Sequence, residues 1–149
     1  MAAGDVSSQP SLRLQIVAPQ GPVYDGDVEM VVVPAVGGEM GILSHHAPLV
    51  AQLAIGRLRA LTSDGEWLNF AVAEGYVKVQ FDKVIVLADA AEEASKIDIE
   101  RVERALERAT RRLEMYHQGT VPEDDEVDPY REMMAIKRAR NRLRVAGVA

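Results

Sequence analysis

The hydrophobic pattern of this chain changes its period once, and this change constrains the fold more than any other feature. Up to about residue 88, apolar and polar residues alternate, as at Leu12, Leu14 and Ile16, which is the period-two pattern of half-buried strands. From about residue 98, apolar residues recur at steps of three and four, which is typical of an amphipathic helix. We therefore expect a strand-rich part followed by a helical part.

Turn signals recur at short intervals in the first part. Asp64-Gly65 separates two strand-like runs, and an Asp-Gly pair at such a place is a strong β-hairpin signal because both residues tolerate a positive φ angle. Phe81-Asp82 separates a second pair of runs in the same way. Many short strands without an intervening helical pattern predict a β sandwich or barrel.

The second part predicts two helices joined by a loop. Asp98 is expected to cap the first helix by accepting hydrogen bonds from free backbone N–H groups, and Gly119 is expected to end it. The segment 118–127 is polar and acidic and is expected to be the loop. Asp128 then caps the second helix, and Pro129 lies in its first turn, where its missing N–H costs nothing. The simplest arrangement is an antiparallel helical hairpin.

Charge is distributed unevenly between the two parts. The net charge is −6, but residues 1–95 carry 5 basic and 12 acidic groups, whereas residues 96–149 carry 12 and 11. Ten of the later basic residues are arginines, whose planar fork of donors suits carboxylates and phosphates. An anionic partner is therefore expected at the second part. Bulk nucleic-acid binding is not expected of an acidic chain without a dominant basic patch.

The charges of the first predicted helix form stripes along its surface. One explanation is a solvated face that pairs its own charges, and the other is a binding surface for an anion or an acidic partner. Arg104 and Arg108 are like-charge neighbours four residues apart, which disfavours a face built for solubility alone. The basic stripe comprises Arg101, Arg104, Arg108, Arg111 and Arg112, and the second helix aligns Arg131, Arg138 and Arg142. In a folded hairpin these two lines of arginines would build one anion site.

Catalytic motifs are missing from the sequence. No cysteine is present, which excludes disulfides, thiol catalysis and thiolate metal sites, and no metal-ligand spacing surrounds His46. His46 is therefore expected to be a turn histidine, with a small enzyme that uses it together with Glu39 or Glu74 as the alternative. The glycine-rich run 37–41 is expected to be a tight turn or a surface loop that docks a partner. Trp67 is expected in the core, and no apolar run approaches the ~20 residues of a membrane-spanning helix.

Several short motifs, in their order and spacing, resemble the epsilon subunit of bacterial F-type ATP synthases. These motifs lie at residues 38–43, 46–49, 73–77, 84–89, 97–101 and 142–146, so the resemblance covers about residues 11–146. It implies a β sandwich of two five-stranded sheets followed by an antiparallel α-helical hairpin. The domains are expected at 11–89 and 98–149, with a linker over 90–97 and a disordered tail over 1–10.

The resemblance also implies a function. It implies a non-catalytic rotor subunit of a proton-translocating ATP synthase, peripheral at the cytoplasmic face of a bacterial plasma membrane and needing neither metal nor cofactor. The implied partners are the gamma subunit, the ring of c subunits and the catalytic beta subunits, and membrane association is only through the complex. The helices are expected to alternate between a folded form and an extended form that inhibits ATP hydrolysis. The residues implied to contact the c-ring and gamma are Glu39, Met40, Gly41, Ile42, Leu43 and His46.

Some members of the family bind ATP in the folded hairpin, so the resemblance implies ATP as a regulatory ligand. The matching positions are Glu92, Asp98, Arg101, Arg108, Arg138 and Arg142. Carboxylates would accept donors of the base or ribose, and convergent arginines would hold the phosphates. The chain departs from the pattern at Val102, at Ser44 and in the acidic loop 118–127, which is expected either to hinder a compact hairpin or to bulge into solvent. The alternative function is a free-standing ATP-binding sensor.

Overall fold

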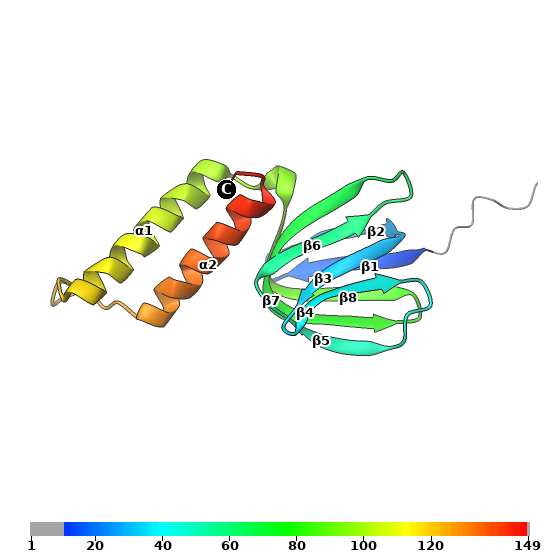
Figure 1. Cartoon of the computed structure of the whole chain (residues 1–149), viewed down its shortest axis with the longest axis horizontal. Coiled ribbons are helices and arrows are strands. Elements are labelled where there is room, and N and C mark those ends of the chain that lie inside the picture. The colour runs from blue at the N-terminus through cyan, green and yellow to red at the C-terminus, as the bar shows by residue number, and fades with distance from the viewer. Residues whose placement is uncertain (1–10, 149) are drawn as a thin grey trace, which may run out of the picture. The chain divides into compact units, whose positions relative to one another are not determined.

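The computed structural model describes residues 11–148, so the tail expected over residues 1–10 lies outside the described residues. These residues form two compact units, the first ending at Glu93 and the second beginning at Ala94. Figure 1 shows strands in the first and helices in the second. The strands are β1 (Leu12–Ala18), β2 (Gly21–Val28), β3 (Met30–Ala35), β4 (Gly38–Leu43), β5 (Leu49–Leu53), β6 (Gly56–Leu61), β7 (Trp67–Gln80) and β8 (Lys83–Glu93). The helices are α1 (Ile99–Gln118) and α2 (Pro129–Val145).

The first unit is a sandwich in which β7 and β8 are long enough to serve in both layers. The first part of β7 pairs with β6 and its last part pairs with β5, while β8 pairs with both parts of β7. One layer therefore has the order β2-β1-β8-β7-β5, and the other has the order β8-β7-β6-β3-β4. With the shared strands counted in each, the predicted two five-stranded sheets are confirmed.

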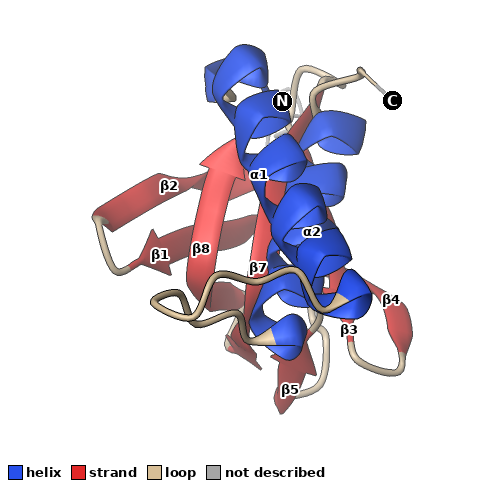
Figure 2. Cartoon of the chain, turned by 90° about the vertical axis from the view of Figure 1, so that its left-hand side faces the viewer, coloured by secondary structure: helices blue, strands red, loops and turns tan. Residues whose placement is uncertain are grey.

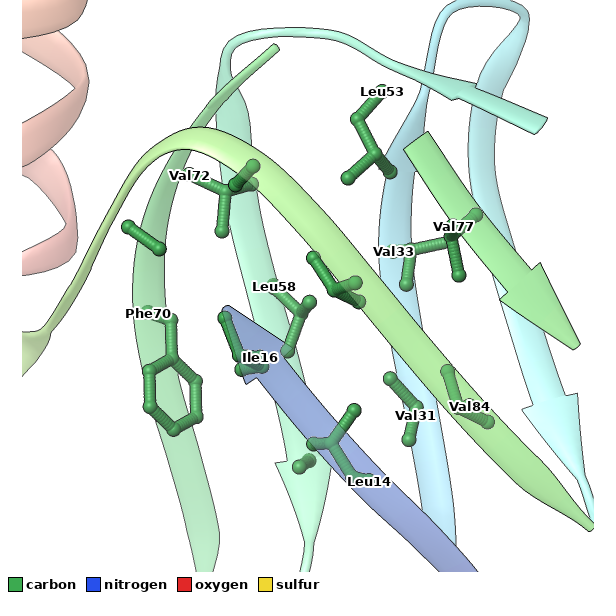
Figure 3. Close-up of a cluster of buried hydrophobic side chains, with 14 of the residues drawn as sticks. Leu14, Ile16, Val31, Val33, Leu53, Leu58, Phe70, Val72, Val77 and Val84 are labelled. Carbon is green, nitrogen blue, oxygen red and sulfur yellow. The ribbon is translucent and has the colours of Figure 1, made fainter. Parts of the chain in front are cut away.

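The alternating pattern of β1 places every second residue in the core between the layers. Leu12, Leu14 and Ile16 are 0% exposed, as the period-two pattern predicts. Figure 3 shows side chains from strands of both layers converging on this core, among them Leu58 and Phe70 of the second layer. The core is one continuous apolar cluster, so the sandwich is stabilised as a whole.

β7 crosses from one layer to the other at Glu74 and Gly75, whose φ angles are 57° and 120°. A Cβ atom built on Gly75 would overlap the carbonyl oxygen of Leu87 and lie 2.8 Å from the Cα of Ala88. Both neighbours are backbone atoms of the paired strand β8, so they cannot rotate away. Glycine is therefore required where the two long strands pass between the layers.

Both predicted β-hairpins form, and the strand after the second is longer than the sequence indicates. Gly65 has a φ angle of 82°, and Phe81 and Asp82 have φ angles of 52° and 57°. β8 continues through Glu93, because residues 90–93 pair with β7 in the second layer. The linker expected over 90–97 is therefore shorter, and it contains one 3₁₀ turn, Ala94–Lys96.

Two further expectations for the sandwich are corrected. Of the run 37–41 expected as a tight turn or loop, only Gly37 lies in a turn, and residues 38–41 belong to strand β4, which lies at the edge of its layer and pairs with β3 along its whole length. Trp67 is 44% exposed rather than in the core, because it lies at the β6–β7 hairpin end. The guanidinium carbon of Arg59 is 5.4 Å from the centre of its ring.

The second unit is the predicted antiparallel hairpin of α1 and α2, which Figures 1 and 2 show side by side. Each helix is capped as expected. The Asp98 carboxylate accepts from the backbone N–H of Arg101 at 3.2 Å, and the Asp128 carboxylate accepts from the N–H of Tyr130 at 3.0 Å. Gly119 ends α1 in the left-handed conformation, with a φ angle of 68°. Neither helix is long and apolar enough to cross a membrane.

Candidate functional site: an arginine-lined groove in the helical hairpin

A groove of about 650 Å³ lies between α1 and α2. Its apolar lining consists of alanines, which leave room between the helices because their side chains are short. The longer lining residues are charged: Arg108 and Arg112 on α1, Arg131, Glu132 and Arg138 on α2, and Glu126 and Asp128 just before α2. The groove therefore offers four guanidinium groups against three carboxylates.

These guanidinium groups are not equivalent. Arg112 is held by acidic partners, whereas no carboxylate within residues 11–148 lies within ion-pair distance of Arg108, Arg131 or Arg138. Three arginines of one groove are thus left to solvent or to a ligand. Guanidinium groups that converge in this way suit phosphate or carboxylate.

The residues predicted to bind ATP are brought together only in part. Arg108 and Arg138 line the same groove, as the two basic stripes predicted. Asp98 and Arg101 lie at the start of α1, outside the lining, and the Asp98 carboxylate already serves as the helix cap.

The remaining two residues predicted to bind ATP, Arg142 and Glu92, also lie outside the groove lining. Arg142 lies in the last turn of α2, and Glu92 belongs to β8 in the first unit. Arg112 and Arg131 line the groove as members of the two basic stripes predicted to build one anion site, although the resemblance did not imply them as ATP-binding positions.

Arg112 links three segments of the second unit. Its Nε lies 3.0 Å from Glu132 Oε1 of α2, and its Nη1 lies 3.2 Å from Asp125 Oδ2 of the loop. Its Nη2 also donates to the backbone carbonyl of Glu126 at 3.0 Å. The hydrogen bonds to Glu132 and then to Asp125 raise the pKa of Arg112. The acidic loop does bulge into solvent, as one prediction allowed, but it is tied to α1.

The segment predicted to contact the c-ring and gamma is divided between the surface and the core. Ile42 is 0% exposed and belongs to the sandwich core, and Met40 packs partly against that core, so alternation along β4 turns both inward. Leu43 is 56% exposed, and Glu39 faces outward to accept from Arg59 at 3.3 Å. A contact surface on β4 would therefore use Glu39, Gly41 and Leu43.

The loop after β4 is held by Asp82 of the β7–β8 turn. The Asp82 carboxylate accepts from the backbone N–H of His45 at 2.6 Å and from the Ser44 hydroxyl at 3.1 Å. The hydrogen bond from His45, and then that from Ser44, lower the pKa of Asp82. Ser44, a departure from the family pattern, thus makes a side-chain contact that fixes this loop.

His46 lies in the same loop, and its contacts match a structural role. Its Nδ1 lies 2.7 Å from the carbonyl oxygen of Ala47, so that nitrogen donates. The structure gives it no carboxylate partner among residues 11–148. Nor do three His, Asp or Glu side chains gather anywhere in that range as a metal ion would need.

The fold is that of a two-domain protein, a β sandwich followed by a helical hairpin with an arginine-lined groove. Family models match each unit separately. The beta-sandwich domain of the ATP synthase delta/epsilon chain matches residues 11–94, and the long alpha-helix domain of the same chain matches residues 95–147. The chain therefore belongs to the ATP synthase delta/epsilon family.

Relatives match over nearly the whole chain. The ATP synthase epsilon chain of Halalkalibacterium halodurans is 45% identical over 139 residues, which are 93% of this chain and 98% of that one. The epsilon chain of Bacillus licheniformis is 46% identical over 136 residues, or 91% and 98%. A chain in the Euglena gracilis mitochondrial ATP synthase complex of OSCP, F1 and c-ring has the same fold, with a TM-score of 0.70, 22% identity and coverage of 94% and 84%.

These matches confirm the resemblance stated from the motifs. The chain is an epsilon-type chain of the ATP synthase delta/epsilon family. It is non-catalytic, so the alternative of a small enzyme built on His46 is wrong.

Proposed function

We propose that this subunit couples the gamma subunit to the c-ring, and that its helical unit switches between a folded form and an extended form that inhibits ATP hydrolysis. The proposal places the subunit at the cytoplasmic face of a bacterial plasma membrane. The observation that carries it is the division of the chain at Glu93 and Ala94 into two compact units. A helical unit that is compact in itself could change its position while the sandwich stays folded.

The sandwich would supply the contact with the c-ring and gamma. Strand β4 lies at a sheet edge, where its backbone on one side has no partner strand among residues 11–148 and its outward side chains are open to contact. Leu43 is 56% exposed and Phe81, beside the clamped loop, is 88% exposed. Exposed apolar side chains beside a fixed loop are a feature of surfaces that dock a partner.

The helices would supply the inhibition. In the extended form, the arginines of α1 would meet acidic segments of the catalytic beta subunits. Charge complementarity of this kind sets orientation and specificity at an interface more than it sets affinity. Two of these arginines, Arg108 and Arg112, line the groove in the folded hairpin, so the two forms would use these charges in two ways.

The structure sets where the chain should be cut to test this proposal. Truncation after Glu93 keeps the pairing of residues 90–93 with β7, which a cut after Asp89 would remove. We expect a reconstituted synthase with the truncated subunit to hydrolyse ATP faster than one with the full chain and to keep proton-coupled ATP synthesis. An unchanged rate of ATP hydrolysis would contradict the inhibitory role. Loss of proton-coupled ATP synthesis would show that the sandwich alone does not couple gamma to the c-ring.

ATP is proposed as a ligand of the folded hairpin, where it would act by population shift. It can favour the folded form only by binding it better than the extended form. The support is that Arg108 and Arg138 line one groove of about 650 Å³, which lies within the usual volume of small-ligand sites, roughly 300–1,000 Å³.

Calorimetric titration of the isolated full chain with ATP tests this site. Arg138→Ala is expected to weaken binding at least about tenfold, because charge-assisted hydrogen bonds are the stronger ones. Arg101→Ala tests whether the site extends to the start of α1. Arg104→Ala is the matched control, since Arg104 is exposed and outside the groove lining. Binding that is indifferent to Arg138→Ala would reject the site.

A further inference from the structure

The contacts of Arg112 are unusual among the charged residues of the helical unit. Its guanidinium uses Nε, Nη1 and Nη2 at once, and the groups that it meets lie on the loop and on α2. The neighbouring Arg111 instead pairs with Glu107 on its own helix, at 2.9 Å and four residues away. Arg111 can therefore stabilise α1, but it cannot join α1 to any other segment.

The surroundings of Arg112 favour ordered ion pairs over transient ones. The side chain of Glu132 is only 13% exposed, and it forms an ion pair with Arg112. The Arg112 side chain is 38% exposed, whereas those of Arg111 and Glu107 are 67% and 69% exposed. A planar guanidinium that meets several acceptors loses less freedom for each hydrogen bond than separate pairs do.

The position of these contacts is as informative as their number. The segment between α1 and α2 in Figure 2 is the long loop that carries the acidic run 123–126. A long free loop adds an entropic cost to closing the hairpin. Arg112 attaches this loop at Asp125 and Glu126 and attaches α2 at Glu132. It thereby fixes the loop and the start of the second helix together.

We propose that Arg112, Asp125 and Glu132 form a latch that holds the helical hairpin closed. Opening the hairpin breaks all of these contacts at one residue, so the latch governs how readily the two helices separate. Its consequence for ATP hydrolysis rests on the proposed function, but the latch itself is a property of the isolated chain. An acidic partner that competes for Arg112 would release it.

Hydrogen exchange of the isolated full chain tests the latch directly. Arg112→Gln keeps a good helix former at the position but removes the charge and the fork. We expect exchange to accelerate about 5- to 30-fold in the first half of α2 as well as in the loop, because both segments are attached through this one side chain. Arg112→Lys keeps the charge without the fork of donors. Its exchange rates in α2 and the loop are expected to lie between those of Arg112→Gln and those of the wild type.

Arg111→Gln is the matched control, because it removes the same kind of side chain one position away. It is expected to leave exchange in α2 unchanged. The latch would be overturned if both variants accelerated exchange equally, or if Arg112→Gln affected the loop alone. Hydrolysis by the reconstituted synthase is measured separately, so failure of the proposed inhibitory role leaves this result intact, and the reverse also holds.

Discussion

The two units of this chain are stabilised in different ways. The difference distinguishes the sandwich, a platform stabilised by its core, from the helical hairpin, which opens more readily. The sandwich has one continuous core cluster, in which side chains such as Leu14, Leu58 and Phe70 are fully buried. No described residue of the helical unit belongs to that cluster, and the buried residues of its helices are Val102, Ala109, Ile136, Ala139, Asn141, Leu143 and Val145. Local opening is expected first where burial is least.

The energetic scale of the two kinds of contact supports this distinction. Full burial of a large aliphatic or aromatic side chain contributes about 1.5–3 kcal/mol, and the sandwich has many such residues. Exposed ion pairs contribute little and weaken with salt. A unit that depends partly on ion pairs can therefore be opened by a partner, whereas the sandwich cannot.

The largest expected effect is at the crossing of β7. Gly75→Ala is expected to destabilise the sandwich by about 4 kcal/mol, because it combines a positive φ angle with overlap against backbone atoms of β8. Gly65→Ala is the control, since Gly65 also has a positive φ angle but nothing within 4 Å of a Cβ. The control is expected to cost about 1 kcal/mol. Chemical denaturation followed by fluorescence measures both, because the only tryptophan of the chain lies in the sandwich. Equal costs would show that overlap at Gly75 is relieved by movement of β8.

A matched pair of core truncations tests whether the units unfold separately. Leu58→Ala is expected to lower the free energy of unfolding of the sandwich by about 3 kcal/mol, since Leu58 is 0% exposed. Ile136→Ala should leave the fluorescence transition of Trp67 in place and shift only the loss of helical circular dichroism. A shift of both signals by Ile136→Ala would show that the hairpin and the sandwich unfold together, and the comparison of two separate units would fail.

A smaller effect is expected at the loop that Asp82 holds. The hydrogen bonds from His45 and Ser44 lower the pKa of Asp82 in the folded chain, so their stabilisation is fully present above the ordinary pKa of 3.8. It is lost as the pH falls through the lowered value. Asp82→Asn should remove this acid-induced change and speed amide exchange at His45 under neutral conditions. Asp64→Asn is the control, because Asn-Gly suits the same hairpin turn as Asp-Gly. Exchange at His45 that is unaffected by Asp82→Asn would show that the loop does not need the clamp.

Much of this fold could be predicted from local sequence patterns. The alternation in β1, the turn at Phe81-Asp82 and the helix caps Asp98 and Asp128 each depend on neighbouring residues alone, and each is found as predicted. Such features are reliable because their cause lies within a few residues of their position.

The differences arise where a distant strand or helix decides the outcome. Residues 90–93 are small or charged and carry no strand pattern, but pairing with β7 makes them part of β8. β4 contains two glycines, and pairing with β3 makes it a strand. The groove was anticipated from two lines of arginines, but which of them meet depends on the register of one helix against the other. That register placed Arg112 beside Glu132, a contact that the basic stripe could not specify.

The smallest expected effect is at an ion pair that resembles the latch but belongs to the other unit. Arg13 of β1 meets Asp25 at 2.8 Å and Asp27 at 3.4 Å, so it also joins one guanidinium to two carboxylates. Its side chain is 48% exposed, and the strands that it connects are already paired and backed by the core. Arg13→Gln is therefore expected to leave the fluorescence transition of the sandwich unchanged, whereas Arg112→Gln accelerates exchange across the hairpin. If Arg13→Gln destabilised the sandwich as strongly as Arg112→Gln loosens the helices, surface charge would matter equally in both units. The contrast between a core-stabilised platform and a charge-latched hairpin would then have to be abandoned.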